Sequence, residues 1–253
     1  MGKFDGYLIC TDYDGTFATK GEPVEKNIPA IRYFTENGGY FTIATGRSVD
    51  FIREKGLDTL INAPACLYNG SLVYDYGANK ILRTRYLPFT VAEFFDLIKP
   101  LLPRVENIDL YEDVGTWIHQ PLGDITGFHL QEKQRKLLCR FATEAEADAF
   151  RAAAEMLLPP GLCSLSKSWA FGVEFNPVDG TKGHALDFVK SYLPGVHTTI
   201  GVGNYDNDLS LLRHADISAA PDGSQESVLA AAKLHLRPCA DGAIADLIDR
   251  LHP

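Results

Sequence analysis

The chain has 253 residues, of which 45% are hydrophobic and 23% charged, as in an ordinary globular protein of one large domain or two modest ones. Its formal net charge of −9 at pH 7 argues against a broad nucleic-acid-binding surface, because such a surface requires a basic face. No apolar run approaches the about 18 residues of a membrane span, and the five cysteines occur singly, so a cytoplasmic location with reduced thiols is expected.

The first expected element is an apolar strand over residues 6–11, which ends at two carboxylates, Asp12 and Asp14. Gly15 permits a sharp turn, so the two acids are expected to lie close together. Close carboxylates repel, which favours either a bound cation or one raised pKa. An ordinary solvated Asp-Gly turn explains the same residues equally well.

Strands and helices alternate through the first third of the chain. This βαβαβ order predicts parallel strands joined by right-handed crossovers. The expected elements after the first strand are a helix over 28–37, a strand over 40–44, a helix over 48–55, a short strand over 65–68 and a hairpin with arms at 72–74 and 80–86.

The middle of the chain has a different pattern, and the last quarter returns to the first one. Helices over 91–102 and 144–158, short strands between them and a strand over 170–175 predict an α+β insert. The sequence therefore predicts an α/β fold, in which a parallel-sheet core (1–86 and 179–253) is interrupted by an inserted α+β domain (87–178). The elements expected in the last quarter are helices over 182–192, 209–214 and 244–251 and strands over 198–202 and 217–219.

Polar side chains follow several strands of the expected core. In an open parallel sheet, ligands bind beyond the carboxyl ends of the strands, and a helix N-terminus attracts anions. Each polar residue alone has an ordinary explanation, such as a surface arginine, a solvated lysine or a helix cap. Their joint placement at separate strand ends favours a site. The residues are Asp12 and Asp14, Thr45-Gly46-Arg47, Asn69-Gly70, Lys182 at a helix start, and Gly203-Asn204 with Asn207-Asp208.

These segments resemble the four ordered motifs of the haloacid-dehalogenase superfamily of phosphatases. The turn at Asn69-Gly70 and the long insert are similar to the cof-like branch, whose members act on sugar phosphates and related metabolites. The resemblance spans nearly the whole chain and implies a Rossmann-like core with a mobile cap over the site. The matching residues are Asp12-Tyr-Asp14-Gly-Thr16, Thr45-Gly-Arg47, Lys182-Gly183 and Gly203-Asn204-Tyr-Asp-Asn207-Asp208.

The resemblance also implies a mechanism. Asp12 would attack phosphorus and form an aspartyl-phosphate, while Asp14 would protonate the leaving alcohol and later deprotonate water. Mg²⁺ is the implied cofactor and a small phosphorylated metabolite the implied partner. By this resemblance the catalytic residues are Asp12, Asp14 and Lys182; the phosphate-binding residues are Thr16, Thr45, Gly46, Arg47 and Asn207; and the metal-binding residues are Asp12, Asp14, Asn204 and Asp208.

One residue departs from the family pattern, because Asn204 stands where the family commonly has aspartate. Its amide oxygen can still ligate Mg²⁺, but one negative charge is missing and weaker metal binding is expected. Two alternatives stay open: a non-catalytic phosphometabolite-binding or regulatory protein, and a phosphomutase that passes the phosphoryl group to another hydroxyl. Candidates for a substrate pocket in the insert are Trp117, His119, His129, Arg135, Trp169, Glu174 and Asn176.

Overall fold

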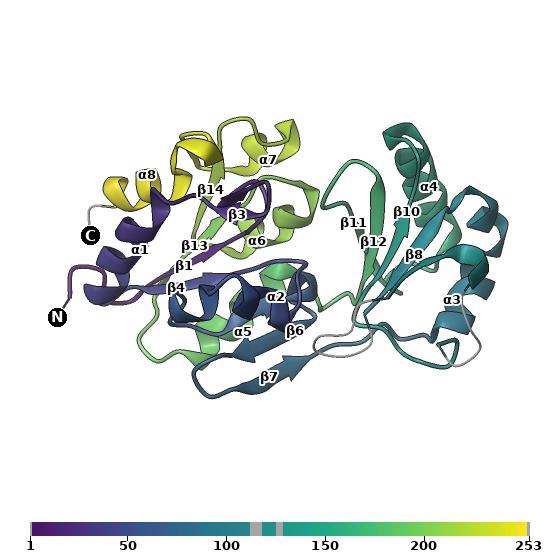
Figure 1. The fold of residues 1–253 in the computed structure, drawn as a ribbon, viewed down its shortest axis with the longest axis horizontal. Helices are drawn as coiled ribbons and strands as arrows, with labels where there is room; N and C mark the ends of the chain where they lie inside the picture. The colour runs from purple at the N-terminus through teal and green to yellow at the C-terminus, as the bar shows by residue number, and fades with distance from the viewer. Residues whose placement is uncertain (1, 112–117, 125–128, 252–253) are drawn as a thin grey trace.

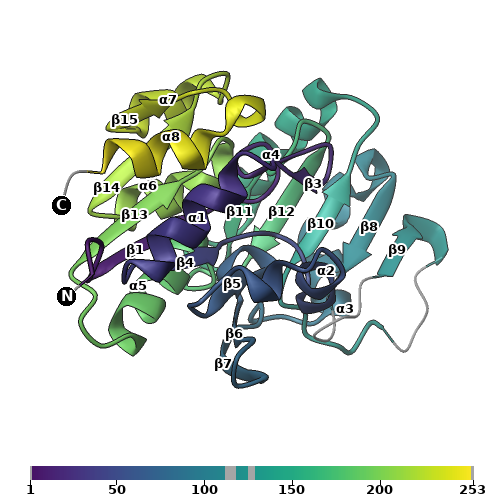
Figure 2. The same ribbon diagram turned by 60° about the vertical axis from the view of Figure 1, so that its left-hand side comes forward.

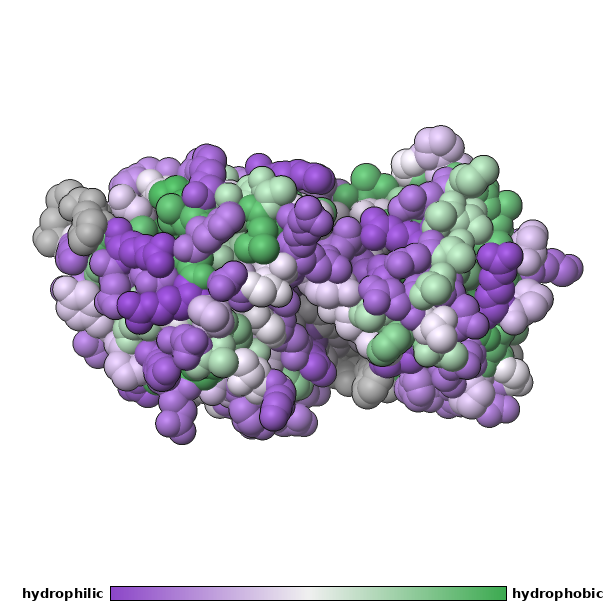
Figure 3. All heavy atoms as spheres, turned by 90° about the horizontal axis from the view of Figure 1, so that it is seen from above, coloured by the Kyte–Doolittle hydropathy of each residue, from purple (hydrophilic) through white to green (hydrophobic). Residues whose placement is uncertain are grey.

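The computed structural model describes residues 2–111, 118–124 and 129–251. These residues form two lobes, each built on a five-stranded sheet (Figure 1). Seen from above, the lobes meet at a waist where hydrophilic side chains predominate (Figure 3). Both ends of the chain contribute to the first lobe, and the middle of the chain forms the second, which we call the inserted lobe.

The sheet of the first lobe is parallel throughout, in the order β15-β14-β13-β1-β4. Strand β1 lies between β13 and β4, so the loops that follow these three strands are neighbours at one edge of the sheet. The bounds are β1 Tyr7–Thr11, β4 Tyr40–Ile43, β13 Thr198–Val202, β14 Ile217–Pro221 and β15 Leu234–Leu236.

Helices cover both faces of this sheet (Figure 2). Along β1, Ile9 packs in one cluster with Phe34 of α1 and Leu247 of α8, whereas Leu8 packs on the opposite side with Leu186 of α5. A parallel sheet that is buried on both faces needs apolar side chains along its strands, so polar groups are left to the strand ends. The helices of this lobe are α1 Asn27–Glu36, α2 Val49–Glu54, α5 Lys182–Tyr192, α6 Leu209–His214, α7 Glu226–Ala231 and α8 Ala243–Arg250.

The strand expected over 65–68 extends the core sheet by a single parallel bridge, between Ala44 and Cys66. Directly after it, Tyr68 and Asn69 have positive φ angles of 49° and 59° and reverse the chain. The strand therefore continues into an antiparallel three-stranded sheet rather than into a further parallel crossover. Its strands are β5 Ala65–Leu67, β6 Leu72–Asp75 and β7 Lys80–Thr84; a smaller hairpin pairs β2 Ala18–Thr19 with β3 Glu22–Pro23.

The sheet of the inserted lobe is antiparallel, in the order β11-β12-β10-β8-β9. Its two helices lie on the side away from the first lobe, and each begins with a capping box, at Thr90 and at Thr143 (Figure 1). Along β10, Leu137 packs toward these helices, whereas Leu138 packs against the cluster of the first lobe. The bounds are α3 Val91–Ile98, β8 Asn107–Leu110, β9 Ile118–Pro121, β10 Leu137–Arg140, α4 Glu144–Leu157, β11 Ser164–Ser166 and β12 Gly172–Asn176.

Three elements of the structure differ from those expected from the sequence. The helix expected over 91–102 is α-helical only to Ile98 and continues as a 3-10 turn, because Pro100 and Pro103 lack the N–H that an α-helix requires. Helix α7 and strand β15 were not expected. Among the helices of the described residues, none has the length and apolar character needed to span a bilayer. The division at 86/87 and 178/179 stays a prediction.

Candidate active site

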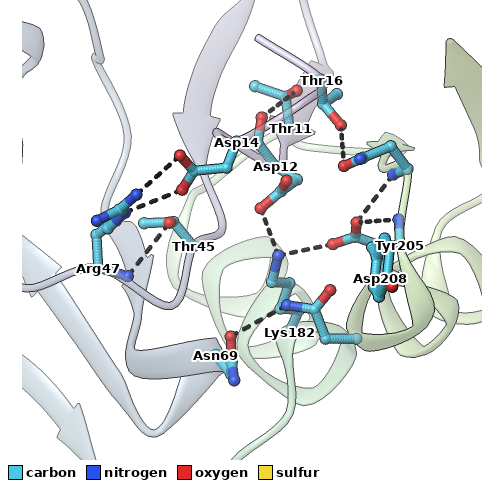
Figure 4. Close-up of polar contacts among 12 residues, drawn as sticks. Thr11, Asp12, Asp14, Thr16, Thr45, Arg47, Asn69, Lys182, Tyr205 and Asp208 are labelled. Atoms are coloured by element: carbon cyan, nitrogen blue, oxygen red, sulfur yellow. Dashed lines mark hydrogen bonds and ion pairs between the residues drawn. The ribbon is translucent and has the colours of Figure 1, made fainter. Parts of the chain in front are cut away.

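Asp12 lies one residue beyond the carboxyl end of β1. Its backbone N–H donates to the carbonyl oxygen of Val202 on β13 at 2.8 Å, which extends the sheet ladder and fixes the backbone here. Its side chain is only 9% exposed, and Oδ1 accepts a hydrogen bond from Lys182 Nζ at 2.5 Å (Figure 4). The first strand and the first residue of α5 thus place a carboxylate and an ammonium group in direct contact.

Lys182 is a fully buried cation that joins two carboxylates, because Nζ also donates to Asp208 Oδ1 at 2.6 Å. Burial and repulsion from Asp208 raise the pKa of Asp12 to about 8, although Lys182 opposes this shift. Burial alone would lower the pKa of Lys182, but the two carboxylates outweigh it and raise the pKa above its usual value. When all three groups are ionised, the cluster carries one uncompensated negative charge, so it attracts a proton or a cation.

The raised pKa of Asp12 predicts that the protein, kept in a chelator, loses stability as the pH rises. An unfolded aspartate has a pKa of about 3.9, so between about pH 4 and pH 8 the folded state binds more protons than the unfolded state. The midpoint of thermal unfolding should therefore fall across this range more steeply for the native chain than for Asp12→Asn. Equal slopes for the two proteins would contradict the raised pKa.

Asp208 fixes the loop that follows β13. Its Oδ2 accepts hydrogen bonds from the backbone N–H groups of Asn204 at 2.9 Å and Tyr205 at 3.0 Å (Figure 4). Because Oδ1 accepts from Lys182, both carboxylate oxygens already have partners. This anchoring role was not predicted from the sequence, and direct coordination of a metal by Asp208 stays a prediction.

The side-chain amide of Asn204 lies among three oxygen atoms. The amide atom that points at them is best assigned as nitrogen, because it can then donate to the carbonyl and the carboxylate, which only accept. This nitrogen lies 2.9 Å from Thr16 Oγ1, 2.9 Å from the carbonyl oxygen of Asp14 and 3.2 Å from Asp12 Oδ2. Thr16 is fully buried and contacts this amide, which accounts for its place in the first motif.

Asp14 directs its carboxylate to Arg47 rather than to Asp12 (Figure 4). The guanidinium donates from Nε and Nη2 to the two carboxylate oxygens, both at 2.9 Å, and its carbon lies 4.6 Å from the centre of the Phe51 ring. Thr45 Oγ1 in turn accepts from the backbone N–H of Arg47 at 3.2 Å. The main repulsion on Asp12 therefore comes from Asp208, and the expected repulsion from Asp14 makes a smaller contribution to its raised pKa.

The inserted lobe contacts the strand ends of the first lobe through buried polar side chains. Asn69 Nδ2 donates to Glu174 Oε2 at 2.9 Å, and Asn207 Nδ2 donates to Asn69 Oδ1 at 3.3 Å. Glu174 also pairs with Lys136 at 2.8 Å. A Cβ atom added at Gly46 would lie only 3.1 Å from Lys136 Nζ, so a glycine allows the inserted lobe to approach this loop closely.

A cavity of about 700 Å³ lies between the two lobes. It brings together most of the residues predicted from the sequence: Asp12, Asp14, Thr45, Gly46, Arg47 and Asn207 all line it. The other described lining residues of the first lobe are Ser48, Asp50, Phe51, Glu54 and Tyr205, and those of the inserted lobe are Tyr111, Lys136, Leu138, Arg140, Ser168, Trp169 and Glu174.

The pocket candidates proposed for the insert have mixed outcomes. Trp169 and Glu174 line the cavity. His119 instead pairs with Asp109 on the neighbouring strand, and Arg135 donates to the hydroxyl of Tyr86 near the junction of the lobes. Asn176 donates to Ser166 and accepts from Asn69, His129 is buried without being one of the described lining residues, and Trp117 lies outside the described residues.

Lys136 and Arg140 were not predicted from the sequence as site residues. They alternate with Leu137 and Cys139, which pack into the core of the inserted lobe. The alternation in Lys136-Leu137-Leu138-Cys139-Arg140 was therefore a usable signal that the first, third and fifth side chains share the opposite face of a strand.

The chain matches the haloacid dehalogenase-like hydrolase family over residues 9–138 and 126–248, which together make up most of its length. The chain belongs to this family. As a haloacid dehalogenase-like hydrolase it is an enzyme, and its relatives support the phosphatase class predicted from the sequence.

Several known proteins resemble this hydrolase over nearly its whole length. A pyridoxal phosphate phosphatase of Escherichia coli is 25% identical over 265 aligned positions, which cover 95% of this chain and 97% of the relative. A haloacid dehalogenase-like hydrolase from B. subtilis has the same fold, with a TM-score of 0.80 at 15% identity, covering 96% and 99% of the two chains. A sugar phosphatase of subclass IIB has a TM-score of 0.75 at 18% identity, covering 96% and 97%.

The oxygen atoms around Asn204 fit a small divalent cation. Asp12 Oδ2 and the carbonyl oxygen of Asp14 lie 3.2 and 2.9 Å from the Asn204 amide, beside a cluster with an uncompensated negative charge. Such hard oxygen donors suit Mg²⁺ in this hydrolase. Within the described residues, no group of three or more His, Cys, Asp and Glu side chains is arranged to hold a metal. The set of oxygen atoms around Asn204 is of another kind, because two of its members are a backbone carbonyl and a side-chain amide.

Proposed function

We propose that this enzyme hydrolyses small phosphomonoesters through an aspartyl-phosphate on Asp12. The observation that carries the proposal is the orientation of Asp12, which lines the cavity while its Oδ1 is held by the buried Lys182. A carboxylate fixed in this way can present its other oxygen to a phosphorus atom, because phosphoryl transfer depends mainly on positioning and charge neutralisation.

In the first step, Asp12 Oδ2 forms a bond to phosphorus as the bond to the ester oxygen breaks, and Asp14 gives a proton to the leaving alcohol. In the second step, Asp14 takes a proton from water, which attacks phosphorus and releases inorganic phosphate and Asp12. Asp14 also lines the cavity, but both of its oxygens accept from Arg47, so it would have to turn away from Arg47 and take up a proton before it acts as the acid. Thr45, Gly46 and Asn207 are proposed to contact phosphate oxygens.

Mg²⁺ is the proposed cofactor. The Asp12 carboxylate, the carbonyl oxygen of Asp14 and the amide oxygen of Asn204 would hold it, with Asp208 beside them. When bound, it would neutralise negative charge on the carboxylates and on the phosphate. Turning the Asn204 amide by half a revolution would present oxygen rather than nitrogen to the cation.

The substrate is proposed to be a small phosphorylated metabolite, such as a sugar phosphate or a compound related to pyridoxal phosphate. The names of the E. coli relative and of the subclass IIB neighbour support this class, and so does a cavity of about 700 Å³. The inserted lobe would act as the cap that selects among such esters. A cytoplasmic location is proposed as well, since five free cysteines suit a reducing compartment.

The proposal is tested by the release of inorganic phosphate from p-nitrophenyl phosphate and a panel of phosphorylated metabolites. Hydrolysis that requires Mg²⁺ and is abolished by a chelator supports it. A purified, folded protein that binds phosphate esters but hydrolyses none would contradict it and favour a binding protein. Transfer of the phosphoryl group to a second hydroxyl of a sugar monophosphate, without free phosphate, would favour a phosphomutase.

Asn204→Asp is expected to strengthen Mg²⁺ binding by about tenfold, since it adds a unit charge next to the proposed cation. Calorimetric titration of Mg²⁺ and the Mg²⁺ concentration for half-maximal activity should both shift in this direction. An unchanged or weaker affinity by calorimetry would remove Asn204 from the proposed metal site.

A further inference from the structure

We infer that the leaving group of the substrate carries no second anionic group: the cavity selects phosphate esters of neutral or cationic alcohols and discriminates against esters that bear a carboxylate or a second phosphate. This inference rests on the proposed phosphatase activity and concerns the part of the cavity beyond Asp12. It follows from the charges of the described residues that line this space.

The cations of the cavity are already paired. The described lining includes three of them, and each has a close carboxylate partner: Arg47 pairs with Asp14, and Lys136 and Arg140 pair with acids of the inserted lobe. Arg140 donates from Nε to both oxygens of Asp109, at 2.9 and 3.1 Å, and Lys136 lies 2.8 Å from Glu174.

The carboxylate partners in the inserted lobe are buried. The side chains of Asp109 and Glu174 are 0% and 1% exposed. A substrate anion at Arg140 or Lys136 would compete for the cation with a buried carboxylate, whose charge already offsets that of the cation. These two cations therefore offer a second anion little net attraction.

On the wall that the first lobe contributes to the cavity, two acidic side chains have no strong partner within the described residues. Asp50 and Glu54 lie one helical turn apart on α2, and both line the cavity. Asp50 has only a loose pair with Arg53, at 3.6 Å, and Glu54 has no ion pair within the described part of the chain. In all, the described lining holds five carboxylates and three cations. This excess of negative charge would repel a second substrate anion.

The remaining lining is aromatic or neutral and polar. Trp169, Tyr111 and Phe51 supply aromatic rings, and Ser168 and Tyr205 supply hydroxyl groups. Such groups can pack against and hydrogen-bond to hydroxyl- or amine-bearing alcohols without a counter-charge. The phosphate itself would be bound separately, by Thr45, Gly46, Asn207 and the proposed cation at the Asp12 end of the cavity.

The test uses three four-carbon alkyl phosphates that differ only in their terminal group: hydroxyl, ammonium or carboxylate. We expect kcat/KM for the hydroxyl and ammonium esters to exceed that of the carboxylate ester by at least about tenfold at low ionic strength, and the ratio to shrink as salt is added. A carboxylate ester that is hydrolysed equally well or better would overturn the inference, with the phosphatase activity still established. No hydrolysis of any ester, including p-nitrophenyl phosphate, would overturn the proposed function itself.

A double variant locates the effect. Asp50→Asn with Glu54→Gln should lower the ratio between the hydroxyl and carboxylate esters by at least about threefold, because it removes the two acids on α2. The matched control is Glu36→Gln with Asp249→Asn, which removes two exposed charges on α1 and α8, outside the described lining of the cavity. The inference is contradicted if both double variants change the ratio equally, or if neither does.

Discussion

Asp12→Asn is expected to lower kcat for phosphate release by at least about 10³-fold, because the amide cannot form the aspartyl-phosphate. The change is nearly isosteric and leaves Lys182 paired with Asp208. It also removes the uncompensated negative charge from the buried cluster, so the variant should be at least as stable as the native chain at pH 8.

Thermal unfolding therefore serves as the control for this variant. Loss of activity together with an unchanged or raised midpoint of unfolding at pH 8 would show that chemistry, not folding, has been lost. Residual activity within tenfold of the native chain would mean that a group other than Asp12 attacks phosphorus.

Lys182→Met is expected to lower the free energy of unfolding by about 3–5 kcal/mol near neutral pH, because Asp12 and Asp208 are left buried without their shared cation. Activity should fall as well, since Asp12 loses the contact that orients it. Protonation relieves the repulsion, so the destabilisation should be greater at pH 8 than at pH 5.

The same substitution elsewhere on α5 gives a matched control. Lys190 pairs with Asp216 at 2.9 Å, but both side chains are more than a third exposed. Lys190→Met should therefore cost only about 0–1 kcal/mol, as for surface ion pairs in general. Equal costs in chemical denaturation at positions 182 and 190 would contradict the structural role assigned to Lys182.

The strands and the helix that carry the candidate site residues of the first lobe were predictable, because strand ends are visible in the sequence. The apolar run before Asp12 and the one before Gly203-Asn204 correspond to β1 and β13, and these strands are adjacent in the sheet. Parallel order then brings their following loops together. The helix expected over 182–192 also has those bounds in the structure, with Lys182 as its first residue.

Pairings between these residues could not be predicted in the same way. Asp14 has Arg47 as its partner and Asp12 has Lys182 and Asp208, a choice that depends on side-chain directions in three loops. Because Asp12 and Asp14 are close in the sequence, repulsion between their two carboxylates was expected instead. The raised pKa on Asp12 follows from burial, which no local pattern around that residue reveals.

The cavity wall from the inserted lobe was the least predictable part. Lys136 and Arg140 face the cavity because of the pleat of β10. The alternation in the sequence indicates that they share one face of the strand, but without the neighbouring strands it does not indicate what that face contacts. Their partners Glu174 and Asp109 lie on β12 and β8, tens of residues away in the chain. Long-range pairing of this kind is set by sheet register, not by local sequence.

The most direct test of the account is chemical trapping of the phosphorylated enzyme. Enzyme mixed with a good substrate is quenched within milliseconds in acid and reduced with borohydride, which converts an acyl phosphate on aspartate to the corresponding alcohol, and the peptides are then analysed by mass spectrometry. The account predicts reduction at Asp12 alone, dependent on substrate. Reduction at another carboxylate, or none at all during rapid turnover, would contradict it.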